Sequence, residues 1–245
     1  MRLFGLIGYP LTHSFSKKYF TEKFEKEGLD DCRYELFPIE SITELPGLIS
    51  QHPDLEGLNI TIPYKKQVLP YLNHTAFIPA GLEACNCILF SEGQLIGYNT
   101  DVVGFRESLR PVLRPDQQSA LVLGNGGATA AVIFALQQLG ISYHIVSRAL
   151  QPGSDFTYQD LDHSIIQSHP IIINTTPVGM YPKEDHCPDI PYESIDERHL
   201  LFDLVYNPAQ TLFLRKGAER GATIKNGEDM LLLQAEESWK IWNSI

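Results

Sequence analysis

The feature that most constrains the fold is a glycine-rich turn between an apolar run and an alanine-rich stretch. Residues 120–123 are apolar and of strand length, and residues 128–139 have the composition of a helix that stops at Gly140. The turn between them reads Gly124-Asn125-Gly126-Gly127-Ala128. Small residues at such a turn let the backbone approach a pyrophosphate, while the helix N-terminus offers free N–H donors. The segment therefore predicts a dinucleotide-binding turn.

Two further details bear on the cofactor. Thr129 stands where the common G-x-G-x-x-G pattern has its third glycine, so a glycine-rich turn without a ligand stays open as the alternative. The next predicted strand ends in Ser147-Arg148-Ala149, without the acidic residue that binds the ribose hydroxyls of NAD. Arg148 is a cation suited to a 2′-phosphate, so NADP is favoured over NAD, although no second basic residue lies nearby.

Apolar runs alternate with helical stretches along the whole chain, which is typical of βαβ units. In the first hundred residues we expect strands at residues 3–8, 32–37, 57–61, 86–90 and 94–98, with Ser91-Glu92-Gly93 as a hairpin turn. Helices are expected at residues 16–27 and after residue 37, and Pro63 can open another because its missing N–H is not needed there. Further on we expect a helix at 101–110, continuously apolar strands at 120–123, 141–146, 171–174 and 200–203, and an amphipathic helix at 229–242.

The predicted fold class is therefore α/β, with two domains. Residues 1–100 form an N-terminal α/β substrate-binding and catalytic domain, and residues 101–226 form a C-terminal Rossmann-like, doubly wound domain for the dinucleotide. By its pattern alone, the helix within residues 227–245 can pack on either domain.

Charge and cysteine usage exclude several classes of partner. Thirty acidic and nineteen basic residues give a net charge of −11, which disfavours nucleic acid and anionic membranes. The cysteines, Cys32, Cys85, Cys87 and Cys187, form no CxxC pair and lack histidines at zinc spacing, so we expect buried reduced thiols and no metal site. The apolar run at 3–8 is too short for a signal sequence or a membrane span, which favours a cytoplasmic protein.

Three polar clusters follow predicted strands of the first domain. Asn59-Ile60-Thr61-Ile62-Pro63-Tyr64-Lys65 and Tyr98-Asn99-Thr100-Asp101 bring a lysine and a carboxylate to strand ends, where α/β sites form. A Lys65–Asp101 pair is suited to proton transfer, with the ammonium as proton donor and the carboxylate orienting it. Ser14 and Ser16 open a helix and suit a substrate carboxylate, although one of them also fits the N-cap.

On these residues the chain resembles the shikimate dehydrogenase family from Gly8 to Gln234. The matching motifs of the first half are Gly8-x-Pro10-x-x-His13-Ser14-x-Ser16, Asn59-Ile60-Thr61-x-Pro63-x-Lys65, Asn86 and Asn99-Thr100-Asp101. Those of the second half are the glycine turn, Asn174-Thr175-Thr176-Pro177-x-Gly179-Met180, Asp203-x-x-Tyr206-x-Pro208-x-x-Thr211 and Gly227-x-x-Met230-Leu231-x-x-x-Gln234.

The resemblance implies reversible NADPH-dependent reduction of 3-dehydroshikimate to shikimate, in chorismate and aromatic amino acid biosynthesis. It implies Lys65 and Asp101 as catalytic residues, and a last helix that returns to the substrate domain. The implied substrate-binding residues are Ser14, Ser16, Asn59, Thr61, Asn86, Tyr206 and Gln234. The implied cofactor-binding residues are Gly124, Asn125, Gly126, Gly127, Ala128, Ser147, Arg148, Thr175, Leu204 and Gly227.

One departure and three alternatives remain. The family usually has Asn-Arg-Thr where this chain has Ser147-Arg148-Ala149, which weakens the NADP preference. The alternatives are a quinate dehydrogenase, a nucleotide-sensing module without catalysis, and a methylenetetrahydrofolate dehydrogenase. The paired serines favour shikimate over quinate, Lys65 with Asp101 favours an enzyme, and Gln234 would have no purpose in the third case. The oligomeric state, monomer or homodimer, is open.

Overall fold

The structure is a computed structural model that describes residues 1–11 and 14–244. The chain divides into two compact units. The first contains Met1–Thr100 and Ala235–Ile245, and the second contains Asp101–Gln234. The boundary between Gln234 and Ala235 therefore falls inside the last helix, α7 (Glu228–Trp242).

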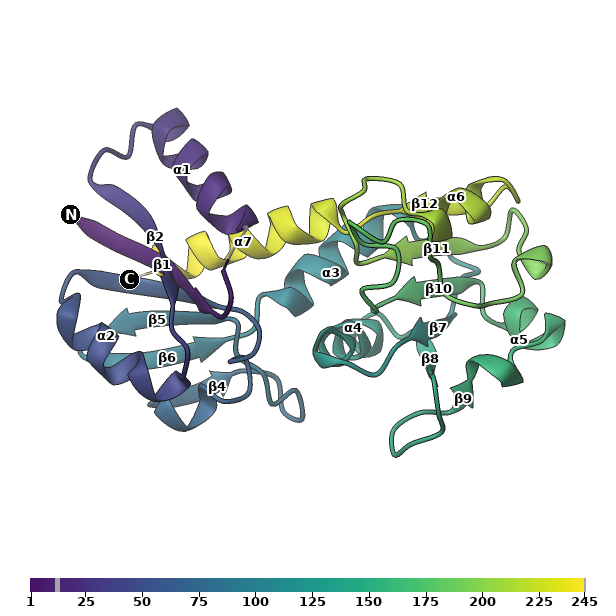
Figure 1. Cartoon of the computed structure of the whole chain (residues 1–245), viewed down its shortest axis with the longest axis horizontal. Helices are drawn as coiled ribbons and strands as arrows, with labels where there is room; N and C mark the ends of the chain where they lie inside the picture. The colour runs from purple at the N-terminus through teal and green to yellow at the C-terminus, as the bar shows by residue number, and fades with distance from the viewer. Residues whose placement is uncertain (12–13, 245) are drawn as a thin grey trace. The chain divides into compact units, whose positions relative to one another are not determined.

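The first unit is built on a six-stranded mixed sheet in the order β2-β1-β3-β5-β6-β4. Five of these strands, all except β3, are labelled in Figure 1. Its strands are β1 (Arg2–Gly8), β2 (Cys32–Pro38), β3 (Leu55–Ile60), β4 (His74–Phe77), β5 (Cys87–Ser91) and β6 (Gln94–Tyr98). Strand β1 pairs in parallel with β2 and β3, whereas β5 runs antiparallel to β3 and β6. The helices are α1 (Phe15–Glu27) and α2 (Leu45–Gln51), with short 3-10 helices η1 (Ile42–Glu44) and η2 (Leu69–Tyr71).

The hairpin expected between residues 86–90 and 94–98 is present. Its two turn residues, Glu92 and Gly93, both have positive φ, at 51° and 74°. Two consecutive positive φ values define the type I′ turn, whose twist matches that of the flanking strands. The glycine supplies this conformation without steric cost.

The prediction of a helix that begins at Pro63 is wrong. Residues 62–68, which the structure describes in full, form consecutive turns that end in η2. The Lys65 carbonyl accepts a hydrogen bond of 2.8 Å from the backbone N–H of Cys85, not from a residue one helical turn further on. This contact spans twenty residues of sequence, so the local pattern around Pro63 could not report it.

The second unit is built on a six-stranded sheet in the order β12-β11-β10-β7-β8-β9, and every neighbouring pair is parallel. Its strands are β7 (Ser119–Leu123), β8 (Ser142–Ser147), β9 (Phe156–Thr157), β10 (Ile171–Asn174), β11 (Leu200–Asp203) and β12 (Thr223–Lys225). Counted from β7, this is the order 3-2-1-4-5-6 of the dinucleotide-binding fold. The side-by-side order of β8, β7, β10, β11 and β12 can be followed in Figure 1. The predicted Rossmann-like class is confirmed.

Four α-helices lie wholly within this second unit. They are α3 (Asp101–Leu109), α4 (Gly127–Gln138), α5 (His163–Ser168) and α6 (Leu212–Ala218), with short 3-10 helices η3 (Arg110–Val112), η4 (Tyr158–Asp160) and η5 (Tyr192–Ser194). The core contains fully buried side chains from the central strands, including Leu121, Ile172 and Leu201. Continuous burial of these strands follows from cover on both faces of a parallel sheet.

Helix α7 ends in the aromatic core of the first unit, so the predicted return of the last helix is confirmed. Trp242 is 2% exposed and stacks on Phe4 with ring centroids 4.8 Å apart. Its Nε1 donates a 3.0 Å hydrogen bond to the Ile88 carbonyl. Gly57 leaves room for the indole, because a Cβ there would lie 2.3 Å from that nitrogen. Within the described residues, no helix is long and apolar enough to cross a membrane.

Candidate functional site

Buried amides and hydroxyls gather at the ends of the central strands of the first unit. Asn59 lies on β3, Asn86 directly precedes β5, and Thr100 follows β6; their exposed fractions are 5%, 3% and 1%. The Asn86 carboxamide donates from Nδ2 to Thr100 Oγ1 at 3.0 Å and accepts from the Thr100 backbone N–H at 2.6 Å. Buried polar groups need such partners, and these fix the orientation of Asn86.

Ser14 and Ser16 lie at the start of α1. The Ser14 side chain caps α1 by accepting from the Lys17 N–H at 3.2 Å. Of the two serines, Ser14 and Ser16, the N-cap is therefore Ser14. Burial raises the pKa of Tyr34, and the nearby Ser16 side chain acts in the opposite direction. Gly8 approaches β3 closely, because a Cβ there would lie 2.4 Å from Thr61 Cγ2. His13 of the same motif lies outside the described residues.

The predicted catalytic residues are placed in different units. Lys65 is half-buried in the turns after β3, in the first unit. Asp101 is the first residue of α3 and belongs to the second unit. The pairing of Lys65 with Asp101 stays a prediction.

The glycine turn lies between β7 and α4, at the point where the strand order of the second sheet reverses. Ligands of open α/β sheets bind at this switch point. Gly124 has a φ of 107°, and a Cβ on it would lie 2.7 Å from Thr176 Cγ2. A Cβ on Gly126 or Gly127 would meet nothing within 4 Å. The first glycine is therefore needed by the fold, whereas the next two leave the space in front of α4 open.

Thr129, which replaces the third glycine, completes this turn. Its hydroxyl accepts from the Gly126 backbone N–H at 3.0 Å and donates to the Gly124 carbonyl at 3.2 Å. It also contacts the Thr175 hydroxyl at 2.8 Å, and Thr175 donates to the Leu123 carbonyl at 2.8 Å. The turn is thereby joined to the loop after β10.

Two further elements surround the turn. Ser147 is buried at the end of β8 and donates to the Ala149 carbonyl at 2.6 Å, while Arg148 is exposed. Gly227 packs against the backbone at Leu204, because a Cβ there would lie 2.1 Å from the Leu204 carbonyl oxygen. The open glycines, the free end of α4 and the exposed guanidinium of Arg148 fit a phosphorylated dinucleotide. Asn125 and Ala128 lie within the same turn.

Sequence reasoning did not assign a role to Asp203, which is fully buried at the end of β11. Its carboxylate accepts from Thr211 Oγ1 at 2.6 Å, from Asn174 Nδ2 at 2.9 Å and from the Val205 N–H at 3.0 Å. Burial raises the pKa of Asp203 to about 6, against the opposing effect of these hydrogen bonds. The carboxylate ties together the loops after β10 and β11. Its signal in the sequence is an acid that ends an otherwise apolar strand.

The remaining two predicted substrate residues lie in the second unit. Tyr206 is 42% exposed after β11. Gln234 is half-buried on α7 and donates from Nε2 to the Leu231 carbonyl at 2.9 Å.

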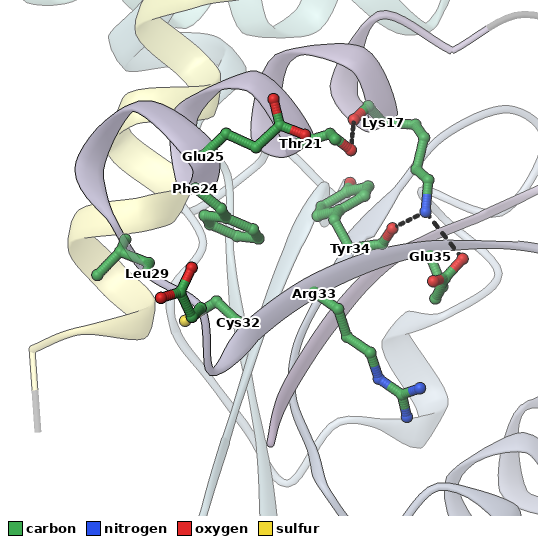
Figure 2. Close-up of a pocket in the computed structure, with 10 residues that line it drawn as sticks. Lys17, Thr21, Phe24, Glu25, Leu29, Cys32, Arg33, Tyr34 and Glu35 are labelled. Atoms are coloured by element: carbon green, nitrogen blue, oxygen red, sulfur yellow. Dashed lines mark hydrogen bonds and ion pairs between the residues drawn. The ribbon is translucent and has the colours of Figure 1, made fainter.

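A groove of about 290 Å³ also lies between α1 and β2, and Figure 2 shows its lining. Its lining side chains include none of the predicted site residues. Lys17 donates there to Glu35 at 2.9 Å and to the Tyr34 carbonyl. Lys17 and Glu35, two of the charged residues that line the groove, therefore pair with each other.

The cysteines are all free thiols. Cys85 and Cys87 are buried as expected, whereas Cys32 and Cys187 are half-buried, so the expectation of burial is wrong for those two. Burial raises the pKa of the Cys87 thiol well above its usual value. Among the described residues, no group of His, Cys, Asp and Glu could hold a metal ion.

Fold and site together are those of a two-domain oxidoreductase with a Rossmann-like domain for a nicotinamide dinucleotide. The family described as the shikimate dehydrogenase substrate binding domain matches residues 6–88. The shikimate dehydrogenase (NADP(+)) of Carboxydothermus hydrogenoformans is 33% identical, and the match covers 100% of this chain and 92% of that protein. That of Clostridium beijerinckii is 37% identical, with 99% and 92% covered. The chain belongs to the shikimate dehydrogenase family.

Solved structures agree with this membership. The shikimate 5-dehydrogenase of Thermus thermophilus, in complex with NADP(H) and shikimate, has a TM-score of 0.87 and 30% identity, and the match covers 100% of this chain and 94% of that one. The Aquifex aeolicus shikimate dehydrogenase has a TM-score of 0.86 and 31% identity, with 100% and 93% covered.

Proposed function

We propose that this protein is an NADP-dependent shikimate dehydrogenase, which reversibly reduces 3-dehydroshikimate to shikimate in chorismate and aromatic amino acid biosynthesis. The observation that carries the proposal is the open Gly126-Gly127 turn at the switch point of an all-parallel sheet. It occurs in a chain that aligns over its whole length with NADP-dependent members of the family.

The cofactor is held in the second unit. Gly126, Gly127 and the N-terminal N–H groups of α4 take the pyrophosphate, because backbone donors and the helix dipole favour an anion. Arg148 takes the 2′-phosphate, because its guanidinium matches the oxygens of a phosphate. Bound NADPH supplies the hydride for the substrate ketone.

The substrate is held by polar side chains, most of them in the first unit. Ser14 and Ser16 receive its carboxylate, while Asn59, Thr61 and Asn86 bind its hydroxyl groups. Tyr206 and Gln234 are the other two proposed substrate-binding residues. The Lys65 ammonium donates the proton that the carbonyl oxygen needs as it becomes a hydroxyl. Asp101 is the second proposed catalytic residue, and a carboxylate is suited to orienting an ammonium. In the reverse direction, neutral Lys65 accepts the hydroxyl proton.

The remaining properties follow from the chain's charge and its family. A net charge of −11 supports a protein without nucleic acid or membrane partners. We place it in the cytoplasm, where the shikimate pathway supplies its substrate, as a monomer or homodimer.

Four initial rates test this function. Purified protein is offered shikimate or quinate, each with NADP or NAD, and reduction of the nicotinamide is followed by absorbance. We expect shikimate with NADP to be the fastest pair. No turnover with any pair would overturn the proposal of an enzyme, and a faster rate for quinate with NAD would assign the protein to quinate.

A further inference from the structure

A hydroxyl of the last helix lies inside the polar cluster of the first unit. Ser238 is on α7 and has an exposed fraction of 0%. Its Oγ accepts from Asn59 Nδ2 at 2.9 Å and lies 3.4 Å from Thr100 Oγ1. Ser238 therefore connects the end of β3 to the residue that directly precedes Asp101.

The Asn59 carboxamide is bonded on both of its ends. Its Oδ1 accepts from the Tyr34 hydroxyl at 2.8 Å, and its Nδ2 donates to Ser238 and, at 3.4 Å, to the Asn86 carbonyl. A backbone carbonyl only accepts, so a donor must face it, and this sets which end of the amide points to Asn86. Both N–H bonds of Asn59 are thus directed at protein atoms.

Tyr34 is a rigid donor in this arrangement. Its ring is 2% exposed and stacks on Phe20 with centroids 4.7 Å apart. Figure 2 shows Tyr34 on β2 with its ring beneath α1 and its carbonyl oxygen bonded by the Lys17 ammonium. Burial raises the pKa of Tyr34 well above its ordinary value, so the hydroxyl keeps its proton. Both contacts come from α1, so this helix holds the donor to Asn59 in place.

We propose that Tyr34 and Ser238 are positioning residues, which act through Asn59 to hold Asn86 and Thr100 in the geometry that binds substrate. This inference rests on the proposed function and deepens it, because it gives Asn59 a supporting role in addition to its proposed contact with substrate. Buried polar networks of this kind specify one arrangement when every member is bonded. The last helix then contributes to the substrate site through a side chain that substrate does not touch.

Two single variants and their combination test the proposal. Tyr34→Phe removes one donor, and Ser238→Ala removes one acceptor. We expect each to raise the KM for shikimate about fivefold, as for the loss of one hydrogen bond, with the KM for NADP unchanged within about twofold. The double variant should resemble the single ones instead of multiplying their effects, because both act on the same amide. Independent, multiplying effects, or equal rises in both KM values, would overturn the proposal.

A second measurement does not depend on turnover. The side-chain NH₂ signals of Asn59, assigned with Asn59→Asp, are followed by NMR hydrogen exchange. We expect slow exchange in the wild type and at least about tenfold faster exchange in Ser238→Ala. Unchanged exchange in Ser238→Ala would overturn the positioning role, even if the wild type proves to be a shikimate dehydrogenase. Faster exchange in Ser238→Ala, together with a wild type that lacks shikimate activity, would instead reject only the proposed function.

A matched control separates these effects from general loss of stability. Ser108→Ala makes the same change at a serine that is 2% exposed on α3, where its Oγ donates to the Phe105 carbonyl at 2.8 Å. We expect this variant to leave the KM for shikimate and the Asn59 exchange rate unchanged. Tyr34→Phe keeps the ring stack, so it stays informative should Ser238→Ala unfold.

Discussion

The two units build their sites from different materials. In the first unit the polar groups are side chains, such as Asn59 and Asn86, which are only 5% and 3% exposed. Their hydrogen bonds go to other buried groups of the protein. In the second unit the site is backbone, with Gly126 and Gly127 leaving open space in front of a helix N-terminus. A substrate with several hydroxyls needs individually placed partners, whereas a pyrophosphate needs N–H groups and room to approach. The first arrangement is sensitive to any lost bond, and the second to any added atom.

The largest expected effect concerns proton transfer. Lys65→Ala should lower kcat by about 10²- to 10⁴-fold, because a positioned acid acts mainly at the transition state. The KM for shikimate should change little. Steady-state kinetics in both directions measure this, with Lys66→Ala as the control, since Lys66 is the exposed neighbour on the same turns. Near-normal turnover of Lys65→Ala would show that Lys65 of the first unit is not the proton donor.

A pH experiment tests the one buried carboxylate of the second unit. The folded-state pKa of Asp203 is raised from 3.8 to about 6, which corresponds to a destabilisation of about 3 kcal/mol at pH 7. The folded protein holds a proton that the unfolded chain releases, so this contribution to stability is present below pH 4 and is lost as pH rises to 6. Urea unfolding should show wild type losing stability relative to Asp203→Asn across that window.

A carboxylate whose pKa is shifted in the opposite direction serves as the control for that experiment. The pKa of Asp196 is lowered, first by its hydrogen bond with Arg198. Its contribution is present above about pH 4, the ordinary carboxyl pKa, and is lost as the pH falls further. Relative to Asp196→Asn, wild type should lose stability on acidification. A parallel response of both variants would contradict the assignment of the raised pKa to Asp203.

Cofactor selectivity gives a smaller effect. Arg148→Ala should raise the KM for NADPH about tenfold, as expected for a charge-assisted phosphate contact at an exposed site, and the KM for NADH by less than about twofold. The comparison uses initial rates with each nucleotide. Arg220→Ala, at an exposed arginine after α6, is the control. Equal effects on both nucleotides would show that Arg148 does not bind the 2′-phosphate.

The glycines of the turn give the smallest and sharpest contrast. Gly124→Ala should lower the free energy of unfolding by about 1–3 kcal/mol, because its φ is 107° and its Cβ would clash with Thr176. Gly126→Ala should change it by less than about 0.5 kcal/mol and still raise the Kd for NADP about fivefold, because the added methyl occupies the approach path of the pyrophosphate. Thermal unfolding and calorimetry separate the two. Unaltered NADP binding by Gly126→Ala would place the cofactor elsewhere.

The sequence predicts the central strands and the glycine turn of the second unit, for a physical reason. These strands are buried on both faces, so each appears as a continuous apolar run, and the glycine turn is a local pattern. Shorter elements such as β9, β12, α5 and α6 carry too few residues for a clear periodicity and were not predicted. The helix at Pro63 was wrong because the Lys65 carbonyl bonds a residue twenty positions further on.

The polar cluster of the first unit shows a similar limit. Asn59 and Asn86 could be selected from strand-end positions and from the family motifs. Their supporting residues could not, because Ser238 is 179 residues from Asn59 along the chain and Tyr34 is 25. A weak signal exists, since Ser238 lies one helical turn after Gln234 and therefore on the same face of α7.

Separate titration of the two ligands tests most directly whether side chains of the first unit bind the substrate and the glycine turn of the second unit binds the cofactor. Shikimate and NADP are titrated by calorimetry into wild type, Ser238→Ala and Gly126→Ala. We predict that Ser238→Ala weakens only shikimate binding and that Gly126→Ala weakens only NADP binding. If either variant weakens both ligands to the same extent, the substrate and the cofactor do not have separate binding elements, and the account is contradicted.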